Sequence, residues 1–471
     1  MKQEVTSDRS LTSWPARSMC QRSASVALAA GLGLALVLLL GAAVAAARPA
    51  DPGSSARGHV IVQFSDHDLL ARAITFTVPI SGMRALELSG LRVITKSFDF
   101  GTLVCSIEGV GCPAENCFCG GTSFWKNSYW DGSAWQVYGV GAGQSTLNDG
   151  AVEGWRWGEW TSTMWPARPV TAALQALDWL RPFQSPTDGG YVSESGSAEV
   201  LLSIGANGHP ANAWRRQSDT PSLAGYWLGR ARSYSSAGAD TAAKLAVGAV
   251  ATDLCWPRNA VRPSAYYSET NGTYNGQYGV GAGPQAWAIL GTLALSETVP
   301  AQAVQVLKNL AEPDGSWKWQ PSAPADTNTT ALALQALIAA GESPTSTVMT
   351  HGLAHLKSLQ DASGGFWRYP DNPNDPDDAP DANSTAYVLQ ALLAAGQDPT
   401  SVDWSQGQNN PISFLLGLQL PDGSLKWRQN SSVGDQLATR QAAVALLGRT
   451  FPLRVAQTTW CNASYLPIMN R

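Results

Sequence analysis

The sequence predicts a mainly α-helical protein: an (α/α)6 toroid of paired helices over residues 165–450, preceded by a small β-rich domain over residues 58–160. Three observations predict this fold class. A nineteen-residue string occurs twice, and looser copies of it recur about every fifty residues. The region before them differs, because it contains short runs in which apolar and polar residues alternate. Repetition at a period of about 20 to 50 residues is typical of repeat architectures.

The first 47 residues are interpreted as a signal peptide or a signal anchor. Arg9, Arg17 and Arg22 form a positive region, and the apolar stretch that follows ends in three alanines, residues 45–47. A positive region, an apolar core and a small-residue cleavage site are typical of a secretory signal, although about 20 apolar residues also suffice to span a bilayer. Both interpretations predict a secreted or cell-surface protein that touches a membrane only through this segment.

Cysteine usage and charge agree with that location. Six of the seven cysteines follow the apolar segment, and an even number in an oxidising compartment indicates disulfides whose pairing is left open. The net charge of −5 means that the chain has no excess of positive charge, which argues against nucleic acid as a partner. The disulfide candidates are Cys105, Cys112, Cys117, Cys119, Cys255 and Cys461.

Residues 58–160 are expected to form strands. Alternating runs begin at His59, Ala73 and Leu103, and glycines are frequent between them. The end of this region is rich in tryptophan. These rings are expected either to pack in the core of the β domain or to stack on a flat macrocycle or a sugar ring. The tryptophans concerned are Trp130, Trp135, Trp155 and Trp157.

The duplicated string runs from Asp326 to Pro344 and again from Asp381 to Pro399, with twelve identical positions. Each copy predicts one inner helix, because an Asn-Thr or Asn-Ser start, an Ala/Leu body and a closing Gly and Pro mark helix ends. A helix that is apolar on every face must be surrounded by protein. We therefore expect at least eleven helices in two concentric layers, followed by a tail over residues 451–471. The leucines expected in the core are Leu334, Leu337, Leu389 and Leu392.

Looser copies extend the repeat in both directions along the chain. Gln285 lies 50 residues before Gln335, and Gln441 lies 51 residues after Gln390. More polar helical stretches alternate with the inner helices, and each is followed by a glycine and aromatic turn such as Gly364-Gly365-Phe366. Six such units predict a closed ring.

The toroid resembles the prenyltransferase and squalene-cyclase repeat family, whose members share Gly-Gly-Phe/Trp turns and Thr-Ala pairs in their inner helices. Residues 98–111, 129–130, 135–139 and 149–158 look similar to the small β domain of transcobalamin and intrinsic factor. The transcobalamins also contain a helical barrel of the same superfamily. The two halves of this chain therefore resemble a transcobalamin-like protein in reverse domain order.

That resemblance implies an extracellular protein that captures cobalamin or a related corrinoid between the toroid mouth and the β domain, with an uptake transporter as a further partner. Inner helices run parallel, so their free N–H groups and positive dipole ends open at one mouth, where they attract polar ligand groups. The residues expected there are Asp326, Asn328, Asp381 and Asn383. The alternative is that these side chains only cap their helices.

A cyclase-like enzyme is the first alternative function. Class II terpene cyclases protonate their substrate with the middle acid of an Asp-x-Asp-Asp-Thr-Ala motif. Aligned through Thr385, this sequence has Asp381, Asn383 and Ser384 at the three motif positions, so an amide replaces the acid. The sequence therefore favours ligand capture over catalysis, and we assign no catalytic residue and no metal ligand. The second alternative is a glycan-binding or structural surface protein.

Overall fold

The computed structural model describes residues 54–257, 259–369 and 379–453. The β-rich region forms a five-stranded sheet in the order β2-β1-β8-β6-β7 and a three-stranded sheet in the order β3-β4-β5. Its elements are β1 (Ser55–Ser65), β2 (Asp68–Thr77), α1 (Gly82–Leu88), β3 (Val93–Phe98), β4 (Gly101–Ile107), β5 (Val110–Gly111), β6 (Phe124–Trp130), β7 (Trp135–Val137) and β8 (Val152–Gly158).

The larger sheet has two differently used faces. Strands β1 and β2 form an antiparallel hairpin, β8 runs parallel to β1, and β6 pairs antiparallel with β8. Successive side chains of a strand point to opposite faces. Trp125 and Trp155 therefore pack into the core of the β region together with Val60 and Val62. Ile61, Leu69 and Ala71 belong instead to the core of the helical part.

Two disulfides close the loop that follows β4. Cys105 is bonded to Cys117, and Cys112 is bonded to Cys119. This confirms the disulfide prediction for the clustered cysteines and gives their pairing. Cys255 has no disulfide partner among the described residues, and Cys461 lies outside them.

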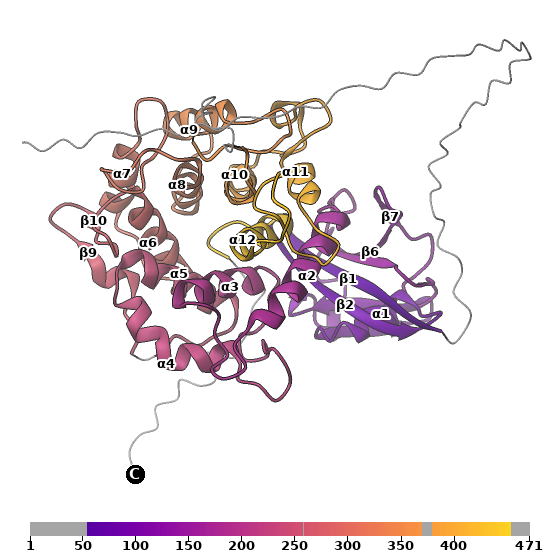
Figure 1. Ribbon diagram of the computed structural model, residues 1–471. Coiled ribbons are helices and arrows are strands. Elements are labelled where there is room, and N and C mark those ends of the chain that lie inside the picture. The colour runs from indigo at the N-terminus through magenta and orange to yellow at the C-terminus, as the bar shows by residue number, and fades with distance from the viewer. Residues whose placement is uncertain (1–53, 258, 370–378, 454–471) are drawn as a thin grey trace, which may run out of the picture. The chain divides into compact units, whose positions relative to one another are not determined.

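Six inner helices form a closed ring (Figure 1). Each packs against the next, and the last, α12, packs against the first, α3. The ring therefore has no free end. In chain order the inner helices are α3 (Glu194–Ala206), α5 (Ala239–Ala251), α6 (Ala282–Ala294), α8 (Thr327–Ala339), α10 (Ala382–Ala394) and α12 (Gln436–Leu446).

The outer layer contains five α-helices, so the described part of the toroid has eleven in all. They are α2 (Ala167–Leu180), α4 (Leu223–Ser235), α7 (Ala301–Asn309), α9 (Thr347–Ser358) and α11 (Pro411–Gly417). This confirms the toroid prediction, including the burial of the four core leucines. No helix within the described residues is long and apolar enough to cross a membrane.

The third outer position differs from the expected all-helical repeat. A 3-10 turn, η3 (Pro263–Tyr266), and a two-stranded ribbon, β9 (Tyr267–Ser268) with β10 (Thr273–Tyr274), take the place of the outer helix. Proline cannot donate to a helical ladder, and glycine gives up the most entropy when ordered. Pro257, Pro263 and Gly272, whose φ is +72°, fall in this stretch, so a helix is disfavoured there.

A repeated hydrogen bond fastens each glycine and aromatic turn to the next inner helix. The side-chain oxygen of the fourth residue of the helix accepts a hydrogen bond from a backbone N–H of the turn. The pairs are Tyr191 with Ser197, Tyr274 with Gln285, Trp317 with Thr330, Phe366 with Thr385, and Leu425 with Thr439. Gln285 is thus equivalent to Thr330 and not to Gln335. The alignment of the repeats that paired Gln285 with Gln335 is therefore wrong.

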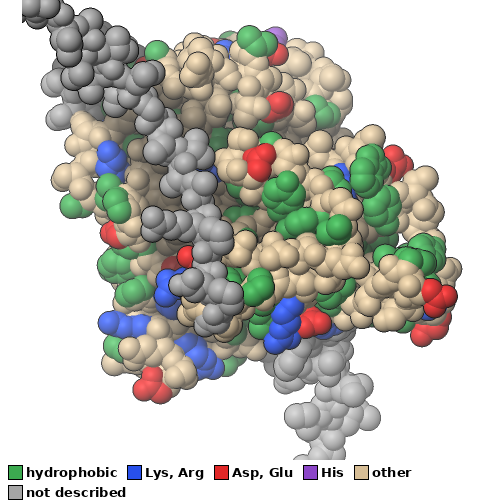
Figure 2. Space-filling view, turned by 90° about the vertical axis from the view of Figure 1, so that its right-hand side faces the viewer, with side chains coloured by type: hydrophobic (Ala, Val, Ile, Leu, Met, Phe, Trp, Pro, Cys, Tyr) green, Lys and Arg blue, Asp and Glu red, His purple; other side chains and the backbone are tan. Residues whose placement is uncertain are grey.

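The surface agrees with the low charge content of the chain. Figure 2 shows acidic and basic side chains scattered over one face of the molecule, separated by uncharged surface. Charged residues make up 14% of the sequence, against roughly 25% in an average soluble domain.

Candidate functional site inside the toroid

The sixth residue of each inner helix lies at one common depth of the ring. These residues are Glu199, Lys244, Trp287, Leu332, Tyr387 and Gln441. Their contacts run across the ring: Lys244 Nζ donates to Glu199 Oε1 at 3.0 Å and lies 5.2 Å from the centre of the Trp287 ring. Gln441 Nε2 donates to Glu199 Oε2 at 3.5 Å. We call these six residues the lumen layer.

The Glu199–Lys244 ion pair joins a buried carboxylate to an ammonium group whose side chain is 18% exposed. Burial alone lowers the pKa of Lys244, but the Glu199 carboxylate, with the hydroxyls of Tyr387 and Tyr234, raises it above its usual value. Burial and the Glu199 charge also raise the pKa of Tyr387. The lysine therefore stays charged and the phenol stays neutral. Removing one member of such a pair would leave an uncompensated buried charge.

Asn383 connects the duplicated string to the lumen layer. It is the second residue of α10, and its Nδ2 donates to Gln441 Oε1 at 2.7 Å. A chain of polar contacts thus runs from Lys244 through Glu199 and Gln441 to Asn383, joining helices α5, α3, α12 and α10. The amide at the position of a cyclase acid is therefore part of the lumen network.

The two repeated aspartates cap their helices. Asp381 accepts from the backbone N–H and the hydroxyl of Ser384, at 2.8 and 2.9 Å. Asp326 accepts in the same way from Thr329, at 2.8 and 3.0 Å. Both are buried, and burial raises the pKa of each carboxyl. Asn328 has a buried Oδ1 with no hydrogen-bond donor among the described residues.

The other end of the toroid is occupied by the chain itself. After α12, Arg449 pairs with Asp68 of the β1–β2 hairpin. The backbone N–H of Phe451 then donates to Gln335 Oε1 at 3.0 Å, and the Phe451 ring lies 5.2 Å from that of Trp287. Residues 449–453, which we call the plug, thus reach the lumen layer from the C-terminal ends of the inner helices.

A cavity of about 510 Å³ lies between the plug and the hairpin. Its walls are apolar on the toroid side and polar on the hairpin side. The lining residues are Ser65, His67, Asp68, Ile338, Ala339, Ala394, Thr450, Phe451 and Pro452.

The β region contacts the toroid at the end away from the repeated aspartates. Asn207, just after α3, accepts from the N–H of Ala71 at 2.7 Å and donates to the Ala71 carbonyl at 3.0 Å. Asp326 and Asp381 instead precede the first residues of α8 and α10. The expected site between those aspartates and the β region is therefore not assembled.

The four tryptophans of the β region serve different structural roles. Trp155 is buried in the core of that region, and Trp157 packs against it. Trp130 and Trp135 line a second cavity, away from the lumen layer.

Sequence reasoning missed most of the lumen layer. The available signal was a charged side chain inside an apolar helix, as with Glu199 in α3 and Lys244 in α5. Charged residues are rarely buried unless paired. Two such residues in separate apolar helices were therefore a sign of contact across the ring.

Residues 267–439 match the family model of the squalene-hopene cyclase C-terminal domain. The match supports the squalene-cyclase type of toroid. No curated protein matches the sequence. The resemblance of the β region to a transcobalamin domain stays a prediction.

Several solved structures are similar to the chain. The type II terpene cyclase MstE from Scytonema is 14% identical, over 60% of this chain and 98% of that one, with a TM-score of 0.43. A protein from Actinoplanes is 16% identical, over 59% and 98%, with a TM-score of 0.42. The ent-copalyl diphosphate synthase from Streptomyces platensis is 16% identical, over 54% and 50%, with a TM-score of 0.37.

The family match corrects the functional prediction. We expected cobalamin capture, with a cyclase-like protein as the alternative, and the match to a squalene-hopene cyclase domain supports the alternative. The separation of Asp326 and Asp381 from the β region gives the structural reason, because the expected composite site required both parts at one mouth.

Proposed function

We propose that this chain is a squalene- and terpene-cyclase-like protein that acts on an isoprenoid chain held in the toroid. The observation that carries this proposal is the family match over residues 267–439, which includes inner helices α6, α8 and α10. Apolar walls suit such a substrate, because burial of hydrocarbon surface drives its binding. Leu332 of the lumen layer supplies buried apolar surface within the ring, next to helix α10.

Cyclisation of this kind begins with transfer of a proton to a carbon–carbon double bond. A neighbouring double bond then closes the ring on the cation, and loss of a proton ends the reaction. The donor must be a carboxyl group that is kept protonated. Asn383 lacks one, and Glu199 is held in its ion pair with Lys244.

We assign proton donation to Asp381, the carboxyl group that the motif retains. Burial raises its pKa, which favours the protonated form. The N–H and hydroxyl of Ser384 lie ready to stabilise the carboxylate left after transfer.

A second candidate function is isoprenoid binding without turnover. The amide of Asn383 favours it, because this side chain donates a hydrogen bond to Gln441 and has no acidic proton to give. Both functions place the same class of ligand in the toroid, so one experiment separates them.

The experiment incubates the protein with squalene and with geranylgeranyl diphosphate and analyses extracts by gas chromatography with mass spectrometry. We expect cyclised product from the wild type, a loss of at least about 100-fold in Asp381→Asn, and a gain in Asn383→Asp, since general acid catalysis contributes about 10² to 10⁴. Asp403→Asn, in the short turn Val402–Trp404, is the matched control.

Substrate binding without product in the wild type, together with product from Asn383→Asp, would establish the binding function instead. An absence of both binding and product in all variants would reject the isoprenoid proposal.

A further inference from the structure

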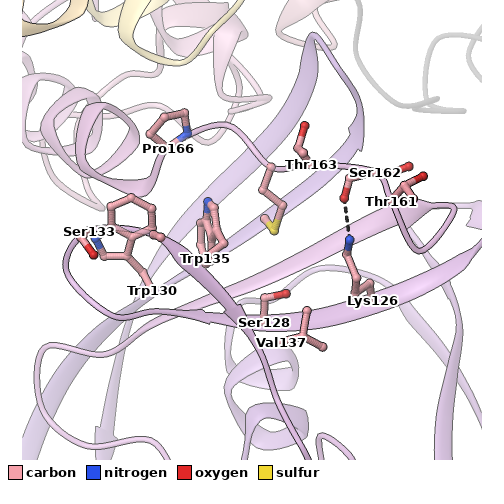
Figure 3. A pocket seen from close by; sticks show the side chains of 12 residues that line it. Lys126, Ser128, Trp130, Ser133, Trp135, Val137, Thr161, Ser162, Thr163 and Pro166 are labelled. Carbon is pink, nitrogen blue, oxygen red and sulfur yellow. Dashed lines mark hydrogen bonds between the residues drawn. The ribbon is translucent and has the colours of Figure 1, made fainter. Parts of the chain in front are cut away.

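A second cavity, of about 410 Å³, lies in the β region between strands β6 and β7 and the segment that leads into the toroid (Figure 3). This volume falls within the range of about 300–1,000 Å³ found for small-molecule sites. Its lining residues are Lys126, Ser128, Trp130, Ser133, Ala134, Trp135, Val137, Thr161, Ser162, Thr163, Met164 and Pro166.

One end of this cavity is aromatic and preformed. The Trp130 and Trp135 rings meet edge to face with their centres 5.5 Å apart, and Trp135 Nε1 donates to the Trp165 carbonyl at 2.8 Å. Gly154 makes room for this arrangement, because a Cβ there would lie 2.5 Å from the Trp135 ring and 3.0 Å from Met164 Cε. The aromatic wall is therefore held in place by packing and a hydrogen bond.

The other end contains the ammonium group of Lys126. Its Nζ donates to the carbonyls of Trp160 and Ser162, at 2.7 and 2.5 Å, and the residue is only 9% exposed. In Figure 3 the lysine lies beside residues 161–163, and Trp130 and Trp135 stand on the opposite side of the cavity. The ammonium group therefore lies at the end of the cavity away from Trp130 and Trp135, with the centre of the Trp160 ring 5.9 Å from its Nζ.

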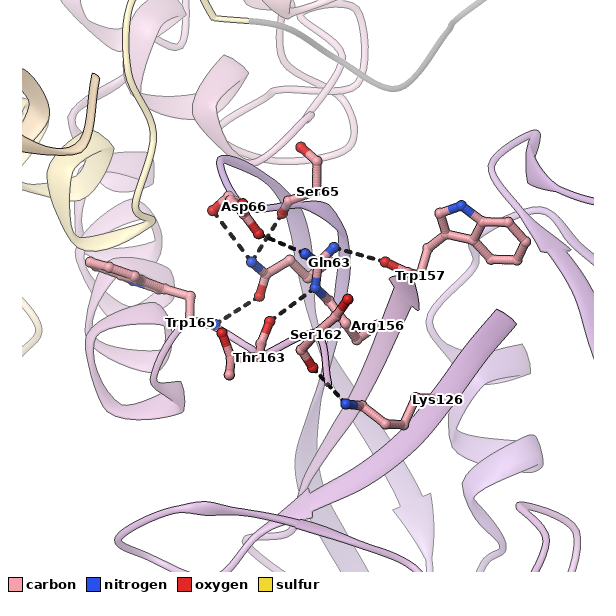
Figure 4. A network of polar contacts seen from close by, with 9 residues as sticks. All are labelled: Gln63, Ser65, Asp66, Lys126, Arg156, Trp157, Ser162, Thr163 and Trp165. Atoms are coloured by element: carbon pink, nitrogen blue, oxygen red, sulfur yellow. Dashed lines mark hydrogen bonds and ion pairs between the residues drawn. The ribbon is translucent and has the colours of Figure 1, made fainter. Parts of the chain in front are cut away.

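A polar network holds the segment that roofs the cavity (Figure 4). Gln63 Oε1 accepts from the N–H of Trp165 at 2.7 Å, and Arg156 Nε donates to the Thr163 carbonyl at 2.9 Å. Arg156 also pairs with Asp66 at 2.7 Å. The roof is therefore tied to strands β1 and β8.

The charge of Lys126 is not balanced by this network. Within the described residues, the ion pair of this region joins Arg156 to Asp66, and no carboxylate lies within ion-pair distance of Lys126. Burial lowers the pKa of Lys126, and the nearby Arg156 lowers it further. A buried charge without a counter-charge is costly. An ammonium group has three N–H donors, of which two are used by the carbonyls.

We propose that this cavity binds a small organic carboxylate with an apolar or aromatic body. The carboxylate takes the third N–H of Lys126 and supplies the missing counter-charge. The body lies against Trp130 and Trp135. This inference is independent of the isoprenoid proposal, because the cavity lies outside the toroid lumen.

The test compares two probes of equal shape, 4-phenylbutyrate and 4-phenylbutan-1-ol, by titration calorimetry with the protein. We expect the acid to bind at least about tenfold more tightly than the alcohol. Lys126→Met should abolish this preference, and Lys126→Arg should retain it. Trp130→Ala should weaken both probes.

Lys426→Met and Trp427→Ala, in a turn of the toroid, are the matched controls and should bind like the wild type. The thermal unfolding of every variant shows whether it is folded. Equal affinity of the wild type for acid and alcohol, or no heat from the acid at about 5 mM, would overturn the proposal. A preference that survives in folded Lys126→Met would also overturn it.

Discussion

At the scale of residues, the duplicated string contains several separate functions in one short stretch. In its second copy, Asp381 caps the helix, Ser384 binds the cap, Asn383 joins the lumen network, and Thr385 fastens the preceding turn. From the sequence, the polar residues at the start of the string were treated as one set, which either contacts a ligand or caps the helix. The structure separates them, because a helix turns by 100° per residue and sends neighbouring side chains in different directions.

The hydroxyl of Thr385 is predicted to contribute measurably to stability. Thr385→Val removes the acceptor of the Phe366 N–H, which lies 3.0 Å away in a buried site. Leaving a buried donor unpaired costs about 1–3 kcal/mol. Denaturant unfolding should show this loss, and Thr385→Ser should recover most of it. Thr350→Val, on the exposed face of α9, should stay close to the wild type.

Glu153 is predicted to make stability depend on pH. Burial raises its pKa from 4.5 to about 7, although Asn127 and Tyr138 donate hydrogen bonds to it and act in the opposite sense. Folding therefore favours the protonated form. The resulting stabilisation, about 3 kcal/mol, is fully present below pH 4.5 and is lost as the pH rises to about 7.

Urea unfolding of Glu153→Gln at pH 5 and pH 8 checks this prediction. The variant should lack most of the loss that the wild type shows between the two pH values, because glutamine has no charge to bury. Glu87→Gln, on the exposed face of α1, is the control. The same pH dependence in Glu153→Gln as in the wild type would contradict the prediction.

At the scale of elements, most of the inner helices could be predicted from their caps and apolar bodies. The string beginning at Asp326 predicts α8 as it is found, with the cap at Asp326. The plug could not be predicted in this way. Its position depends on contacts between Phe451 and residues of α6 and α8, which lie more than 100 residues away along the chain.

Phe451→Ala is predicted to destabilise the protein by about 3–5 kcal/mol, the range for truncating a buried phenylalanine. The ring is 5% exposed and packs on Trp287. If the isoprenoid occupies the toroid, the space left by the ring should also strengthen squalene binding. Phe183→Ala, where the side chain is 43% exposed, is the control for both measurements. Unchanged stability would show that the plug does not fill the lumen in solution.

At the scale of the whole molecule, the β region and the toroid share part of one core. Ile61, Leu69 and Ala71 pack with the toroid core, and Asn207 forms two hydrogen bonds with the backbone of Ala71. Composition showed that the two regions differ in type. It did not show which mouth the β region would contact, because that depends on surface complementarity between distant segments.

Asn207→Ala is predicted to weaken the junction by about 1–3 kcal/mol, since it leaves the buried N–H of Ala71 unpaired, whereas the Ala71 carbonyl keeps its hydrogen bond from Arg72. Hydrogen exchange should report faster opening of residues 68–77, and Asn259→Ala, at an exposed position, should not change it. If the exchange of β2 is unaffected, the shared core does not depend on this residue.

The contact of α12 with α3 has a consequence for how the protein unfolds as well as for how it folds. Linear repeat proteins begin to unravel at their outermost units, which have only one neighbour. A ring offers no such starting point, because every unit is supported from both sides. The first unit to open must lose its contacts with both neighbours at once, so unfolding begins more slowly. The same feature slows assembly, because the seam joins segments more than 200 residues apart in the chain.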